Sequence, residues 1–154
     1  MTTPAYPNLQ RGISFTILLG NGATPEVFTQ LVIATSQNFA RAIETEKHGE
    51  VDASNPTNLP GRFSVAKMQS FDLDISGRCD YLAMQTLEGW LDGNPHNVEI
   101  QYGNGTLAGA KGGGSYLGAV VLTSLGNVKQ DSGTVTFTAK LEGQGPLPAW
   151  TANS

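Results

Sequence analysis

The stretch SFDLDISGRC, residues 70–79, alternates polar residues with apolar or small residues along its whole length. Phe71, Leu73 and Ile75 fall on one side of the alternation, and Asp72 and Asp74 fall on the other. Because successive side chains of a strand point to opposite faces of a sheet, this pattern predicts a strand over residues 68–79 with one buried and one solvated face.

Six further segments have the composition or the alternation of strands. They lie at residues 13–19, 27–34, 37–45, 98–102, 116–125 and 134–142. Asn-Gly pairs at residues 21–22 and 104–105 are typical of tight turns, and the first pair predicts a hairpin between the first two strands. The Gly-rich residues 107–115 are predicted to form a flexible loop, and residues 126–132 to turn the chain.

A single helix is predicted over residues 81–92. Asp80 can cap its first turn, and Gly93 can adopt the left-handed conformation that often follows a helix. Its apolar stripe consists of Tyr81, Met84, Leu87 and Leu91, with Ala83 and Trp90 beside it. A helix this short needs its stripe to be buried against a sheet. The sequence thus predicts one domain over residues 1–154, a mainly β antiparallel sandwich or barrel with one flanking α-helix.

Two segments lie outside this pattern. Residues 46–67 have little periodicity, contain two prolines and carry charges of mixed sign at Lys47, Glu50, Asp52, Arg62 and Lys67. A long loop in a compact domain is commonly functional, so we predict an arm that projects from the body; a floppy surface loop is the alternative. Residues 143–154 are predicted to be an extended C-terminal tail, in which Trp150 packs on its own domain or on a neighbour.

Composition excludes several classes of function. Charged residues make up 14% of the chain and the net charge is −4, so a dedicated nucleic-acid binder is disfavoured. The single cysteine, Cys79, rules out an internal disulfide and a multi-cysteine zinc site. The mean hydropathy is −0.17, residues 1–10 do not resemble a secretory signal, and no apolar run approaches about 18 residues, so no membrane span is expected.

Catalytic constellations are absent from the sequence. His48 and His96 do not have the spacing of metal ligands. Asp72 and Asp74 could in principle act as an acid pair, but such a pair more often marks a solvated face. The glycines near Lys111 lack the spacing of a phosphate-binding loop. We therefore expect a non-enzymatic protein without metal or cofactor.

Self-assembly is the remaining inference from the residues. The predicted strands carry many Thr, Ser and Ala residues and few charges, which leaves sheet edges poorly protected against pairing with another chain. The arm and the tail would add further contact surfaces. A monomeric β-domain with long loops is the alternative.

The order of these features resembles the major tail tube proteins of long-tailed (siphovirus-type) bacteriophages. The resemblance spans residues 13–143 and is carried by the hairpin, the charged loop, the strand SFDLDISG at residues 70–77, the short helix, VLTSL at residues 121–125 and GTVTFTAKLEG at residues 133–143. It implies a β-sandwich whose copies form hexameric rings that stack into a hollow tube for DNA ejection. It also implies a location in the virion tail after synthesis in the host bacterial cytoplasm.

The resemblance further implies particular surfaces and partners. The wall of the lumen would be neutral or acidic, and six copies at −4 each carry −24 per ring. The candidate lumen-facing residues are Asp72, Asp74, Thr134, Thr136, Thr138 and Glu142, although Lys140 on the same face departs from a purely acidic wall. This face could instead lie outside the tube or beneath the helix. Expected partners are other copies, a tape measure protein, a tail terminator and distal tail or baseplate proteins, with DNA only in transit and no membrane.

Two alternatives stay open at the level of sequence. A tube protein of a related injection system, such as type VI secretion or a tailocin, would share the fold. A carbohydrate-binding β-sandwich would need exposed aromatic residues in a groove, and Trp90 is expected to be buried, leaving Trp150 and a few tyrosines.

Overall fold

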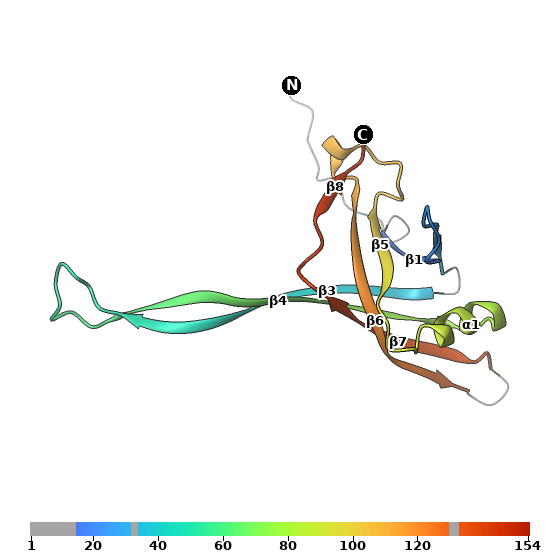
Figure 1. The fold of residues 1–154 in the computed structure, drawn as a ribbon, viewed down its shortest axis with the longest axis horizontal. Coiled ribbons are helices and arrows are strands. Elements are labelled where there is room, and N and C mark those ends of the chain that lie inside the picture. The colour runs from blue at the N-terminus through green and yellow to red at the C-terminus, as the bar shows by residue number, and fades with distance from the viewer. Residues whose placement is uncertain (1–14, 32–33, 130–132) are drawn as a thin grey trace, which may run out of the picture.

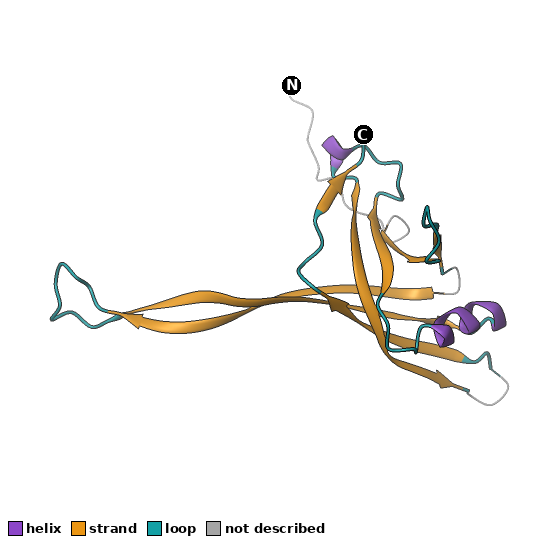
Figure 2. Cartoon of the chain, in the orientation of Figure 1, coloured by secondary structure: helices purple, strands orange, loops and turns teal. Residues whose placement is uncertain are grey.

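The computed structural model describes residues 15–31, 34–129 and 133–154. Eight strands and one α-helix, α1, make up most of this part of the chain, and Gly109–Lys111 form a short 3-10 helix. In chain order the elements are β1 (Phe15–Gly20), β2 (Phe28–Gln30), β3 (Ala34–Glu50), β4 (Gly61–Arg78), α1 (Tyr81–Gly89), β5 (His96–Tyr102), β6 (Gly114–Val128), β7 (Thr136–Gln144) and β8 (Trp150–Ala152). Figure 2 shows how strands dominate the fold. The predicted mainly β fold with one helix is confirmed.

All eight strands belong to one antiparallel sheet with the order β2-β1-β5-β6-β7-β4-β3, and β8 also pairs with β6. The sheet is open, because β2 and β3 end the hydrogen-bonded path. It nevertheless bends over on itself, so that the backbone N–H of Ile17 in β1 donates to Oε1 of Gln37 in β3. The two halves of the bent sheet thereby enclose a core.

The core confirms the alternation in residues 70–79. Phe71, Leu73 and Ile75 are each no more than 1% exposed. The buried β7 residues Phe137, Ala139 and Leu141 lie beside them on the same face of the sheet. The same core cluster includes Ile17, Val98, Ile100 and Val120. Gly143 of β7 leaves room for the ring of Phe71, because a Cβ at Gly143 would lie 2.5 Å from Cδ1 of that ring.

The helix is shorter than predicted and buries a narrower stripe. Asp80 caps it as expected, with Oδ2 accepting from the N–H of Ala83 at 3.3 Å, but the helix ends at Gly89 and Trp90 follows as its C-cap. Met84, Leu87 and Trp90 are buried, whereas Tyr81 is 93% exposed and Leu91 is 49% exposed. The prediction for those last two side chains was wrong, since α1 packs only one side against the sheet. Gly93 is left-handed but lies in the turn toward β5.

The most important correction concerns residues 46–67, which are not an irregular loop. β3 and β4 pair from Ala34↔Gly77 to Glu50↔Gly61, with a register shift between Glu44 and Thr45, so only residues 51–60 are a loop. Figure 1 shows this hairpin projecting far from the body. The prediction of a projection is confirmed, while its internal structure was missed because a hairpin outside the core has no buried face and needs no apolar alternation.

Several boundaries also differ from the predictions. β2 is only three residues long, β3 begins at Ala34, β5 begins at His96 and β7 begins at Thr136. Residues 13–14, 32–33 and 130–132 of the predicted strands and turn lie outside the described residues. The Gly-rich stretch 107–115 is not a flexible loop, because it holds the 3-10 helix and the start of β6 and receives the C-terminal strand.

Candidate assembly surfaces

A polar outer face covers four neighbouring strands on the side opposite the core. Asp72 lies across from Glu142, and Asp74 lies across from Lys140. Ser76 and Arg78 of β4 continue the row across from Thr138 and Thr136. Because paired residues in antiparallel strands share a face, the structure brings together five of the six residues predicted to line a lumen. They are Asp72, Asp74, Thr136, Thr138 and Glu142.

Thr134 does not belong to this face. It precedes β7 and lies in a hollow beside α1. Arg78, which sequence reasoning did not select, shares the face with Lys140, so its charged residues are three acids and two bases. The alternation of residues 72, 74, 76 and 78 along the strand places Arg78 on the same face as Asp72 and Asp74, so the sequence contained this signal. The face extends to Asn38 on β3 and Ser124 on β6 through further register pairs.

Two open edges border this four-stranded half-sheet. Within the described part of the chain, β3 ends the sheet on one side. On the other side, β6 pairs with β5 only as far as His96↔Val120, so Val121 to Val128 have a strand partner in β7 alone among the described residues. Residues 34–40 (ATSQNFA) and 121–128 (VLTSLGNV) contain no charged residue. Proteins normally protect such edges with charges, so both are suited to pairing with another chain.

The arm formed by residues 41–70 carries different charges on its two faces. Every one of its residues is exposed, so none of them belongs to the hydrophobic core, although Arg41 and Gln69 at its base contact Tyr116 and Leu147. Register pairs place Lys47 and Arg62 on one face and Glu44, Glu46 and Glu50 on the other. The acidic face also carries Phe63, Val65 and Met68, which are 53–58% exposed. Lys67 sits at the register shift of β4.

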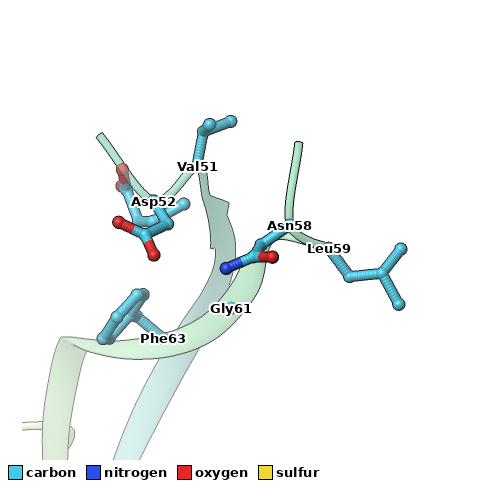
Figure 3. A pocket seen from close by; sticks show the side chains of 7 residues that line it. Val51, Asp52, Asn58, Leu59, Gly61 and Phe63 are labelled. Atoms are coloured by element: carbon cyan, nitrogen blue, oxygen red, sulfur yellow. The ribbon is translucent and has the colours of Figure 1, made fainter. Parts of the chain in front are cut away.

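The tip of the arm is ordered by its own hydrogen bonds. Oδ1 of Asp52 accepts from the hydroxyl of Ser54 at 2.6 Å and from its backbone N–H at 2.9 Å. Both hydrogen bonds lower the pKa of Asp52, and the bond from the Ser54 hydroxyl has the larger effect. The backbone N–H of Asn58 donates to the carbonyl of Asn55, which adds a second turn. Figure 3 shows Leu59 directed away from the hollow between Asp52 and Phe63.

Trp150 packs on its own domain. Its ring lies 4.9 Å from that of Tyr116 and 5.5 Å from that of Tyr102, and β8 pairs with the start of β6. Gly114 provides the room, because a Cβ there would collide with the indole. The backbone N–H of Asn153 also donates to Gly113, which ties the tail down. Trp150 therefore explains the glycine at position 114.

The two histidines have local partners. Nε2 of His48 lies 3.8 Å from Glu46 on the exposed arm. His96 stacks on Trp90 at 4.5 Å, and its Nε2 lies 3.2 Å from Oδ1 of Asp92. The pKa of Asp92 is lowered most by the hydrogen bond from the backbone N–H of Asn94 and next by the hydrogen bond from the His96 side chain. The described ranges contain no cluster of three or more His, Cys, Asp or Glu residues suited to a metal, and no helix there has the length and apolar character needed to cross a membrane.

Solved structures supply the comparison that decides the fold. The tail of an empty gene transfer agent (GTA) particle, refined with C6 symmetry, matches with a TM-score of 0.72 and 14% identity over 94% of this chain and 100% of that chain. The SPP1 tail tube matches with a TM-score of 0.66 and 11% identity over 94% of this chain and 81% of that chain. This chain has the fold of a tail-tube subunit.

A further match comes from another class of particle. A chain of the anti-feeding prophage (AFP) baseplate matches with a TM-score of 0.55 and 15% identity over 99% of this chain and 98% of that chain. No protein-family model and no curated protein matches the sequence. At these identities the likeness establishes the fold, and the functional argument rests on the surfaces described above.

Proposed function

We propose that the chain is the structural subunit of a hollow phage tail tube, built of stacked hexameric rings through which DNA is ejected. The observation that carries this proposal is the half-sheet β6-β7-β4-β3, which has a polar outer face and two uncharged open edges. The similarity to assembled tails supports the same function. The chain acts without catalysis, as part of the virion tail.

The two edges fit each other in direction. Strands in the half-sheet alternate, so β6 and β3, separated by two strands, run antiparallel to one another. Pairing the β3 edge of one copy with the β6 edge of the next therefore continues the antiparallel order. Such a head-to-tail contact closes into a ring when the rotation per copy divides a full turn.

Ring closure by six copies gives a wide barrel. Four strands from each copy make about 24 strands, and barrels of roughly 16–18 strands already leave an aqueous channel. If the outer face lines this channel, Asp72, Asp74 and Glu142 meet the passing DNA together with Lys140 and Arg78. An excess of acids over bases avoids the strong binding to phosphates that a basic wall would produce.

The remaining surfaces provide contacts outside the ring. The arm, with Lys47, Glu50, Asp52, Arg62 and Lys67 exposed, reaches a neighbouring copy. Terminal rings meet a tape measure protein inside and a tail terminator and distal tail or baseplate proteins at the ends. Trp150, which is 42% exposed, keeps a surface available for a further contact while it holds its own tail.

Electron microscopy of the purified protein in negative stain tests the proposal. We expect rings or tubes with an axial hole at high protein concentration. A variant with lysine at two positions of the β6 edge, Thr123→Lys and Gly126→Lys, should remain folded and fail to form rings, because charges at an edge oppose strand pairing. A wild-type protein that stays strictly monomeric at high concentration would refute the proposal.

A tube subunit of a related injection device is the second candidate. The match to the AFP baseplate chain favours it, although its TM-score of 0.55 is lower than the 0.72 for the GTA tail. Neighbouring genes discriminate between the two. Capsid and tape measure genes indicate a phage, whereas sheath and ATPase genes indicate the injection device.

A further inference from the structure

The arm is joined to the body at its base, where β3 and β4 leave the sheet together (Figure 1). Every residue from 41 to 70 is exposed, whereas Phe71, the next residue of β4, is 1% exposed. A register shift lies farther out, between Glu44 and Thr45 of β3, where Lys67 is an extra residue of β4. An extra residue of this kind bends a strand and increases its twist. The contacts made at the base therefore decide where the arm points.

Arg41 ties the first strand of the arm to the body. Its guanidinium carbon lies 4.6 Å from the ring centre of Phe39 and 5.6 Å from that of Tyr116. Its Nη1 donates to the hydroxyl of Tyr116 at 3.4 Å, and the two rings are 5.7 Å apart. A planar guanidinium stacks on aromatic faces in a way that a lysine does not reproduce. Because β3 and β6 are not neighbours in the sheet, this contact joins strands that no backbone pairing connects.

Gln69 ties the second strand of the arm to the segment between β7 and β8. Its Oε1 accepts from the backbone N–H of Leu147 at 3.2 Å. Leu147 packs against the hydrophobic core, and the ring of Trp150 in β8 lies 4.9 Å from that of Tyr116. Register pairs place Gln69 on the same face of the hairpin as Arg41. Both strands of the arm are therefore tied to one region of the body from one face.

Arg41 and Gln69 differ from the other side chains of the arm. Of the side-chain hydrogen bonds in the described part of the chain, only theirs join the arm to residues outside it. The bonds of Asp52 and Asn55 stay within the tip. From Arg41 to the end of β3 at Glu50 the strand advances about 30 Å at about 3.3 Å per residue, so a change of about 10° at the base moves the tip by about 5 Å. A small loss of order at the base thus becomes a large one at the tip.

We propose that a brace, formed by Arg41 and Gln69 on the arm and by Tyr116 and residues 145–150 on the body, sets the direction of the arm. Arg41 and Gln69 are positioning residues, which act on assembly through the tip rather than by touching another copy. The C-terminal segment also gains a role beyond closing its own sheet, since Trp150 anchors the segment that Gln69 contacts. The effect on assembly rests on the proposed function, whereas the brace itself is a property of the single chain.

A distance measured within the dilute, unassembled protein tests the brace. Spin labels are attached to Leu59→Cys at the arm tip and to Leu117→Cys on β6, which are 93% and 58% exposed, and Cys79→Ser removes the native cysteine. Double electron–electron resonance then gives the distribution of distances between the labels, which should be single and narrow. Arg41→Gln combined with Gln69→Ala should increase the width of this distribution about twofold, because the side-chain ties at the base are lost.

Two further variants make the measurement decisive. Arg62→Gln is the matched control, because it removes the same type of side chain beyond the register shift and should leave the width unchanged. Arg41→Lys keeps the charge but loses the planar contact, so it should give an intermediate width even where the double variant fails to fold. Widths that stay narrow without the brace residues, or that broaden equally in Arg62→Gln, would overturn the brace.

Tube assembly supplies a second measurement. The double variant Arg41→Gln/Gln69→Ala should need about tenfold more protein than wild type to form tubes, because a mobile tip has to be ordered when copies meet. An unchanged concentration would overturn the positioning role of the two residues. Wild-type protein without rings or tubes would instead refute the proposed function, and the distance measurement would still decide the brace.

Discussion

Gly143→Ala tests whether close packing in the core fixes the shape of the subunit. Gly143 lies on β7, and the ring of Phe71 fills the space that a Cβ at this position would occupy. The Phe71 side chain is 1% exposed. A Cβ at this position would lie 2.5 Å from Cδ1 and 2.6 Å from Cζ of the ring. Real Cβ contacts do not come this close, so the ring or the strand must shift.

The cost follows from the rigidity of the site. Overpacking a close-packed core costs about 1–3 kcal/mol, and the buried ring has little room to move. For a domain of this size, about 2–4 °C of melting temperature are lost per kcal/mol, which gives a decrease of roughly 2–12 °C. We expect the free energy of unfolding to fall by about 2 kcal/mol, measured by urea denaturation of the dilute, unassembled protein.

Two variants complete the experiment. Gly126→Ala is the matched control, since a Cβ there meets nothing within 4 Å, and its stability should stay equal or rise by up to about 1 kcal/mol. Phe71→Leu makes room for the extra methyl group, so the double variant Phe71→Leu/Gly143→Ala should lose less than the sum of the single losses. Equal losses from Gly143→Ala and Gly126→Ala would refute the reasoning.

Three further predictions concern the surface. Limited proteolysis of the dilute protein should cut first within residues 51–60, because this loop is exposed at the end of a hairpin that lies outside the core. The same sites should be protected in tubes, and equal cleavage in both states would contradict an arm contact. Asp80→Ala should lose about 1 kcal/mol in urea denaturation, because it removes the cap of α1. The lowered pKa of Asp92 adds stability above about pH 4 that is lost as the pH falls through its folded pKa, so Asp92→Asn should flatten the dependence of stability on pH in that acidic range.

The boundaries of the arm show the limits of local pattern. β3 and β4 each run for 17 or 18 residues, but only the parts next to the core alternate clearly. Farther out, backbone hydrogen bonds between the two strands hold the hairpin, and the side chains face solvent on both sides. No apolar period arises there, so the charges and glycines indicate an irregular loop when the sequence is taken alone.

The Gly-rich segment before β6 illustrates a second limit. Its composition is typical of a flexible loop, yet Gly114 is small because Trp150 lies against it. The reason for the glycine is a residue 36 positions later in the chain. Only the pairing of β8 with β6 brings the two together.

The sequence by itself determined the β class, the strand at residues 70–79 with its two faces, the capped helix and the absence of a recognisable catalytic motif. These features depend on neighbours in the chain, and the period of side chains along one strand reports them directly. The tertiary structure decided the extent of the arm, the place where Trp150 packs, the separation of Thr134 from the outer face and the two open edges. Those properties depend on which strands pair, and strand pairing is set by contacts between residues far apart in sequence.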